Sequence, residues 1–367
     1  MLISTRRRWL VVVVAVGAVV AAALLVPTTR DLCLGYLSGE PFYEGRPVRY
    51  WVRTLGMGDA QEREWAANAL GHLGAVSPQV LPGLAKALHD EDYIVRRNAA
   101  EAIGRIGPGA RDISSGLIDA LRDSDVRVRY RVALAVGQIQ PEPKTAVPAL
   151  LELARKERDG TTLGAAMASL GTFGAAAESA IPFLVERIRD PAARGSLAAI
   201  GPAAVPALMT VCQKGDARAR AGAAETLAAL GEAARAAIPA LQILLKDDSV
   251  AVRVPAAAAL WKIEGRVDGT VEALSAALAS FDTNIKGDAM VVLASMGPKA
   301  ASAIGPLQAC LRDENHTMRR LAIQALAKIG PEARAALTAL ETVAREDEVP
   351  EIRRTATAAI DQIRGRK

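Results

Sequence analysis

A short apolar motif recurs along most of the chain and restricts it to a repeat architecture. The sequence LGHLG at residues 70–74 returns 33 residues later as IGRIG at 103–107. Unequal intervals of 27 and 30 residues around Leu197 mark one shortened unit. A period in this range is typical of solenoids, whose units bury their apolar faces only against their neighbours. The first residue of the motif falls at Leu70, Ile103, Val136, Leu170, Leu197, Leu227, Leu260, Leu293, Leu326 and Ile360.

Each unit is predicted to contain two helices. In the first helix, apolar residues at Val95, Ala99, Ile103 and Ile106 follow the spacing of one helical face. A Gly-Pro pair then ends the helix, because glycine permits a left-handed turn and proline cannot continue the helix. A second apolar helix follows, with proline near its start, where the missing N–H costs nothing. These prolines are Pro148, Pro182, Pro206, Pro239 and Pro306.

The pattern D-x-x-x-x-V-R, followed by A-x-x-x-L-G-x-I-G-P, resembles the HEAT-repeat family, in particular its short bacterial branch with phycobilin-lyase-type repeats. The resemblance covers residues 59–364. It implies an all-α, right-handed α-solenoid of about ten repeats, whose second helices line the concave face. The preceding sequence EGRPVRYWV resembles a segment that often precedes such repeats in exported bacterial proteins. We expect it to form an opening helix, with Tyr50 and Trp51 covering the first repeat.

The N-terminus contains an uncharged stretch of eighteen residues, 9–26. As a helix it would span about 27 Å, enough for a bilayer core. The basic flank Arg6-Arg7-Arg8 is expected to stay cytoplasmic, which places the repeats on the far side, the periplasm in a bacterium. The alternative is a signal peptide cleaved near the alanines at 21–23, which would release an exported soluble protein.

These features divide the chain into five predicted parts. They are a cytoplasmic basic flank (1–8), a transmembrane anchor or signal peptide (9–26), a short glycine- and proline-containing tether (27–46), an N-terminal capping helix (47–58) and the HEAT-repeat solenoid (59–367).

Composition excludes several classes of function. The formal charge of +5 includes the three arginines of the flank, so the remainder carries 5 − 3 = +2. A nucleic-acid-binding protein would need a clustered basic face, so no nucleic-acid partner is expected. Cys33, Cys212 and Cys310 are far apart, which argues against a disulfide framework or a zinc site. The last two are expected to behave as small core residues.

An aspartate and an arginine six residues later recur in many units. One interpretation is an anion-binding stripe. The other, which recurrence in nearly every repeat favours, is structural: each aspartate caps a helix start and each arginine bonds an adjacent repeat's aspartate or carbonyl. Arg63, Arg220 and Lys286 share the arginine register. The proposed inter-repeat ladder comprises Asp90, Arg96, Asp123, Arg129, Asp247, Arg253, Asp313, Arg319, Asp347 and Arg353.

No catalytic motif or cofactor site is recognised. HEAT-repeat metalloenzymes such as deoxyhypusine hydroxylase carry His-Glu dipeptides, whereas His72, His89 and His316 are the only histidines here and none precedes a glutamate. A bilin-type chromophore lyase would need an aromatic, basic cavity, and aromatics make up only 4% of the chain.

Solenoids commonly use an extended surface to hold another protein or peptide. The chain is therefore expected to be a non-catalytic, membrane-tethered scaffold for a protein or peptide partner. The alternative is a HEAT-like enzyme such as a bilin lyase.

Overall fold

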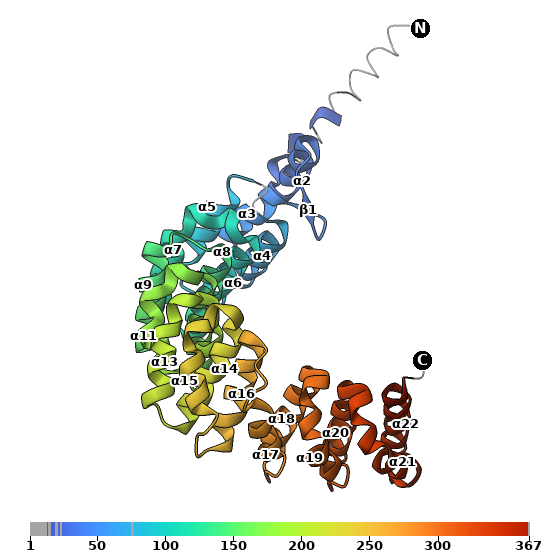
Figure 1. Ribbon diagram of the computed structural model, residues 1–367. Coiled ribbons are helices and arrows are strands. Elements are labelled where there is room, and N and C mark those ends of the chain that lie inside the picture. The colour runs from blue at the N-terminus through green and yellow to red at the C-terminus, as the bar shows by residue number, and fades with distance from the viewer. Residues whose placement is uncertain (1–12, 14–15, 19–20, 23, 75–76, 366–367) are drawn as a thin grey trace, which may run out of the picture. The chain divides into compact units, whose positions relative to one another are not determined.

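The computed structural model describes residues 13, 16–18, 21–22, 24–74 and 77–365. The predicted basic flank and half of the predicted membrane segment lie outside these residues. The chain divides into two compact units, Met1–Ala177 and Glu178–Lys367. Within each unit, helices follow one another in the order of the sequence (Figure 1).

The segment that is predicted to tether the repeats has regular secondary structure. It contains α2 (Pro27–Ser38) and a two-stranded antiparallel hairpin, β1 (Phe42–Tyr43) and β2 (Arg46–Pro47). The helix α3 (Val48–Met57) follows and packs against α4 (Ala60–Leu73). An ion pair between Arg53 Nε and Asp31 Oδ2, 2.7 Å long, joins α3 to α2.

The hairpin also contacts the first repeat. The ring of Tyr43 stacks on His72 with a centroid distance of 5.0 Å, and its carbonyl accepts a hydrogen bond from Trp51 Nε1. Trp51 is buried, whereas Tyr50 is only partly buried and lies under the Arg46 guanidinium. Trp51 and Tyr43 thus link the hairpin, α3 and α4.

The repeats of the first unit alternate long first helices with shorter or equal second helices. The first helices are α4 (Ala60–Leu73), α6 (Tyr93–Ile106), α8 (Val126–Ile139) and α10 (Gly160–Thr172). The second helices are α5 (Val80–Ala87), α7 (Ser114–Asp119) and α9 (Pro143–Lys156), with 3₁₀ turns η1 (Gly107–Ile113) and η2 (Ala120–Arg122). A further 3₁₀ segment is η3 (Gly174–Ala180).

The second unit repeats this arrangement. Its first helices are α12 (Pro191–Ile200), α14 (Ala217–Leu230), α16 (Val250–Glu264), α18 (Thr283–Met296), α20 (His316–Ile329) and α22 (Pro350–Arg364). Its second helices are α11 (Ile181–Glu186), α13 (Val205–Lys214), α15 (Ile238–Leu244), α17 (Thr270–Ala277), α19 (Ile304–Cys310) and α21 (Leu337–Glu346). The 3₁₀ turns are η4 (Pro202–Ala204), η5 (Gly231–Ala237), η6 (Gly297–Ala303) and η7 (Gly330–Ala336).

Two helical runs among the described residues are long and apolar enough to cross a membrane by length and composition alone. They are Ala217–Leu244 and Thr283–Cys310, with a third if the bent pair from Pro191 to Lys214 counts as one span. Each run contains the two helices of one repeat, and apolar residues such as Leu227 and Leu293 are fully buried. Packing between repeats therefore accounts for much of their hydropathy.

The second glycine of the recurring motif ends the first helix, as predicted. Gly107, Gly201, Gly297 and Gly330 have φ between 55° and 91°, a region that side chains with a β-carbon disfavour. A 3₁₀ turn that leads into the second helix begins at this glycine or, in η4, at the proline that follows it. Pro148 differs from the other second-helix prolines, because it lies inside α9 rather than in its first turn.

The first glycine of the motif has a different role, which is close packing of neighbouring first helices. A β-carbon at Gly71 in α4 would lie 2.8 Å from both Cα and Cβ of Ala102 in α6. At Gly104 in α6 it would lie 3.3 Å from the Cα of Ala135 in α8. Glycine therefore sets the spacing of first helices in this unit, since even a methyl group would displace a backbone.

We expect Gly71→Ala to lower the free energy of unfolding by about 1–3 kcal/mol, because the added methyl overpacks the contact between α4 and α6. Gly164→Ala is the matched control: Gly164 lies inside α10 with no atom near the position of its β-carbon. It should gain about 0.5–1 kcal/mol from helix propensity. Urea denaturation of the two variants measures the difference, and equal effects would contradict the packing role.

Candidate functional site

The recurring arginines form forked bonds to the carboxylate of the next repeat. In each pair, Nε and Nη2 donate to the two carboxylate oxygens at 2.7–3.2 Å. Nη1 donates to a main-chain carbonyl near the start of its own helix. The pairs are Arg63–Asp90, Arg96–Asp123, Arg129–Glu157, Arg220–Asp247 and Arg319–Asp347, with Lys286–Asp313 as a single bond of 2.7 Å.

This arrangement corrects one part of the sequence interpretation. The ladder aspartates do not occupy the N-cap positions. The N-cap of α6 is Asp92 and that of α8 is Asp125, each two residues beyond the ladder aspartate. Asp90 instead accepts the N–H of Asp92 at 2.9 Å, which closes the turn before the helix. A carboxylate in that turn can reach the arginine of the preceding repeat, whereas a capping carboxylate is engaged by its own helix.

Burial and pairing act in opposite directions on the ladder carboxyls. Burial raises the pKa of the Asp90 carboxyl, but the bonds from Arg63 and from the Asp92 N–H outweigh burial and hold the pKa below its ordinary value. The same balance lowers the pKa of Asp347 beside Arg319. The carboxyls of Asp90 and Asp347 are therefore ionised at neutral pH and occupy the arginine forks of Arg63 and Arg319.

Two of the predicted arginines lack a carboxylate among the described residues. Arg253 in α16 keeps the main-chain bonds, with Nη1 2.7 Å from the Asp247 carbonyl, but Ser280 stands 27 residues later where the acid is expected. Arg353 in α22 likewise bonds only the carbonyls of Asp347 and Glu348. Glu157, which the sequence interpretation missed, could have been found from its spacing of 28 residues after Arg129.

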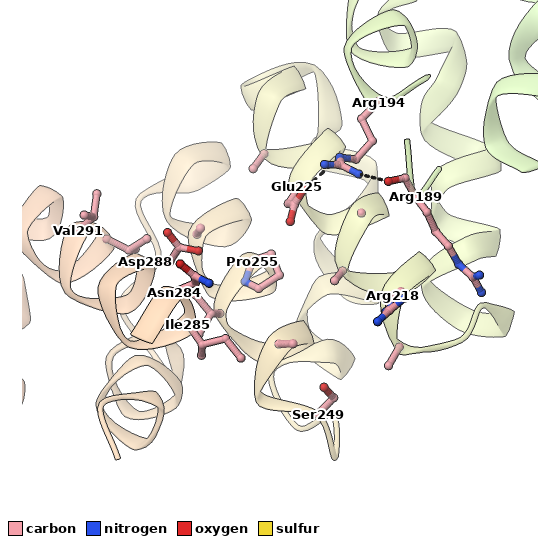
Figure 2. Close-up of a pocket in the computed structure, with 18 of the residues that line it drawn as sticks. Arg189, Arg194, Arg218, Glu225, Ser249, Pro255, Asn284, Ile285, Asp288 and Val291 are labelled. Carbon is pink, nitrogen blue, oxygen red and sulfur yellow. Dashed lines mark hydrogen bonds and ion pairs between the residues drawn. The ribbon is translucent and has the colours of Figure 1, made fainter. Parts of the chain in front are cut away.

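A groove of about 900 Å³ lies across α14, α16 and α18 (Figure 2). Its apolar surface includes Val254, Pro255 and the half-exposed Val291. Several charged side chains lie among the lining residues, together with Asn284 in the first turn of α18. The sequence interpretation placed the concave surface on second helices, whereas this groove is lined by first helices. No motif marked these residues in advance.

Charge in the groove is unevenly compensated. Arg194 Nε pairs with Glu225 Oε2 at 3.0 Å, and its Nη1 donates to the Arg189 carbonyl. Asp288 has no cation within bonding distance among the described residues, and burial together with the nearby Asp282 raises the pKa of its carboxyl. One wall of the groove is thus fixed by an ion pair, while the α18 wall presents an uncompensated acid.

The groove coincides with a repeat that breaks the packing rule. Trp261 in α16 occupies the position held by Gly71, Gly104 or, in α14, Ala228. Its ring is partly buried, and Lys299 Nζ lies 5.1 Å from the ring centroid. In addition, Pro255 lies inside α16, where it cannot donate a main-chain hydrogen bond to the helix. A bulky ring cannot replace a glycine at a close backbone contact, and α16 contacts α18 less extensively than it contacts α14.

The remaining candidate residues have structural surroundings. Cys212 and Cys310 are buried, which confirms the prediction that they are core residues, and burial raises the pKa of Cys212 to about 11. Cys33 is exposed. Among the described residues, no group of three or more His, Cys, Asp or Glu side chains has the geometry of a metal site.

With this geometry established, comparison with known proteins places the chain in a family. A model of HEAT repeats matches residues 52–115, 114–200 and 271–361, more than half of the sequence. The chain belongs to the HEAT-repeat family. A comparison with curated proteins finds no match.

Solved structures of similar fold include karyopherins. Kap95p, in a structure concerning its binding to RanGDP, has a TM-score of 0.65 at 14% identity, covering 86% of this chain and 51% of Kap95p. Kap121p bound to the extreme C-terminus of the phosphatase Cdc14p has a TM-score of 0.65 at 12% identity, covering 88% and 43%. Importin beta has a TM-score of 0.63 at 14% identity, covering 86% and 52%. This HEAT-repeat chain spans about half the length of these karyopherins, and the likeness shows a shared fold.

Arg96→Gln should lower the free energy of unfolding by about 2–3 kcal/mol, because it leaves the largely buried carboxylate of Asp123 without its charged partner. Arg122→Gln removes the same charge from the exposed pair with Glu152 and should leave the melting temperature nearly unchanged. Thermal unfolding followed by circular dichroism compares them. Similar losses in both variants would refute a special contribution from the forked pair.

Proposed function

We propose that this protein is a membrane-tethered, non-catalytic scaffold that binds a segment of a partner protein in the groove of its second unit. The observation that carries the proposal is the groove itself, which crosses three consecutive first helices and combines apolar surface with charged side chains. Two helix spacings of 8–10 Å give a length of about 16–20 Å, which suits five or six extended residues.

The residues of the groove favour a peptide over a chromophore. Alanine, valine, isoleucine and proline supply its apolar surface, and none of the described residues that line it is aromatic. A bilin would require stacking partners and a basic cavity. The karyopherin Kap121p, which shares the fold, binds the C-terminus of another protein. Peptide binding is therefore the better use of this surface.

The proposed tether is the uncharged segment 9–26, with the arginines at 6–8 in the cytoplasm and the HEAT repeats outside it. The length of the segment supports a membrane span, and its basic flank supports this orientation. A protein released by cleavage near residues 21–23 is the alternative outcome.

Photo-crosslinking tests the groove. A benzophenone amino acid at Val291, which is 56% exposed on α18, should crosslink to one discrete partner in intact cells. The control position is Ile243 on the second helix α15, which is 69% exposed and does not line the groove. Ala258→Trp, which fills the groove, should abolish the adduct from Val291. Equal adducts from both positions, or an adduct that survives Ala258→Trp, would overturn the assignment of this groove.

A dual topology reporter fused after Lys367 tests the tether. We expect activity only outside the cytoplasm and retention of the fusion in carbonate-washed membranes. Deletion of residues 1–26 should leave the fusion in the cytoplasm. Cytoplasmic activity of the full-length fusion would show that the orientation is reversed. Recovery in the soluble exported fraction would show that the segment is a cleaved signal peptide.

A further inference from the structure

The interrupted ladder at α16 leaves an arginine fork oriented but without a carboxylate. Arg253 Nη1 donates to the carbonyls of Asp247 and Asp248 at 2.7 and 3.1 Å, as Arg319 does to the carbonyls of Asp313 and Glu314. In Arg319, Nε and Nη2 then hold the two oxygens of Asp347. In Arg253, these two groups have no acceptor among the described residues. The main-chain bonds therefore hold the guanidinium in the orientation that binds a carboxylate in the other repeats.

Ser280 explains why the fork is incomplete. It occupies the ladder position, 27 residues after Arg253, the same spacing as Arg220 to Asp247. Its Oγ accepts the N–H of Asp282, so the turn before α18 is closed as in the other repeats. A serine side chain, however, is shorter than that of aspartate and has only one oxygen. It therefore cannot accept the forked bonds of the arginine in the preceding repeat. The turn therefore has the same hydrogen bond as in the other repeats, but the carboxylate that would accept from the arginine is missing.

The neighbouring residue presents an apolar surface at the same turn. Phe281 is fully exposed, with a relative accessibility of 103%, the highest among the described large apolar side chains. An exposed phenylalanine at a turn contributes nothing to the core. It is the type of side chain that gains free energy when a partner covers it.

Nearby acids do not satisfy Arg253. Both oxygens of Asp247 are bonded to Arg220, and Oδ1 of Asp282 caps α18 through the N–H groups of Asn284 and Ile285. The unsatisfied edge of Arg253 is thus available to a carboxylate from outside the chain. A bidentate, charge-assisted pair of this kind specifies its ligand by shape as well as by charge.

We propose that Arg253 and Phe281 form a recognition site for an acidic residue of the partner, whose aspartate or glutamate completes the ladder in place of the carboxylate that Ser280 lacks. An apolar residue next to that acid packs on Phe281. The site lies at the turn that leads into α18, the helix whose first residues line the groove. This inference rests on the proposed function, because it specifies the chemistry of the segment that the groove binds.

Two fluorescein-labelled peptides of about twelve residues provide the probe, since about 40 Å of extended chain reaches from the turn across the groove. One carries two Leu-Glu-Leu segments in a glycine-serine background, and the other carries Leu-Gln-Leu. Fluorescence anisotropy with the full-length protein in detergent should show the glutamate peptide binding about tenfold more tightly, the value for one charged pair.

Variants of the protein separate recognition from folding. Ser280→Asp should raise the melting temperature, because it completes the ladder, and should weaken binding of the glutamate peptide about tenfold. Ser302→Asp adds the same charge to η6 and should change neither. Arg253→Gln should lose the preference for glutamate, whereas Arg353→Gln, which removes the same fork in α22, should keep it.

Equal affinity for the two peptides, no binding of either, or unchanged binding in Ser280→Asp would overturn the inference. These results leave the proposed function standing if the crosslink from Val291 persists. Loss of that crosslink's specificity would instead refute the groove as the binding site, whichever peptide binds better.

Discussion

Neighbouring first helices lie so close together that glycine or alanine is required where they touch. The β-carbon missing at Gly71 would meet the backbone of Ala102, and the one missing at Gly104 would approach Ala135. Close approach brings the turn before each first helix within reach of an arginine from the preceding one. The forked pairs of the ladder, such as Arg96–Asp123, therefore depend on this spacing. The ladder in turn fixes the register of repeats whose alanine-rich contacts specify it weakly.

The requirement for small residues between first helices also explains the position of the groove. Trp261 replaces the small residue in α16 and Pro255 lies inside that helix, while Ser280 replaces the ladder acid before α18. These three departures fall at α16 and at the turn before the next first helix, α18, and the groove across α14, α16 and α18 lies there. Five other arginines of the ladder hold a carboxylate of the next repeat. A partner can replace contacts only where the repeat has left them unmade, which is why we place both the binding groove and the carboxylate recognition at this repeat.

The HEAT repeats contain two kinds of residue with different roles. Buried alanine, leucine and isoleucine hold the repeats together, and their loss costs stability. Exposed residues such as Val291 and Phe281 contribute little to folding, so the choice of amino acid at these positions can serve partner binding. Karyopherins share this fold at 12–14% identity, so very different sequences can form it.

The sequence alone was sufficient for the repeat fold. Its period located the helix pairs, the motif's second glycine located the helix ends, and the spacing of arginines and acids indicated a ladder, because each of these depends on local geometry repeated many times. It did not indicate that the motif's first glycine packs against the next helix, that Asp90 lies in the turn rather than at the cap, or that the groove lies on first helices. Those facts depend on which side chains of different repeats meet. The exposure of Phe281 and the unmatched fork of Arg253 became visible only in the tertiary structure, since a missing contact can be recognised only where its neighbours are in place.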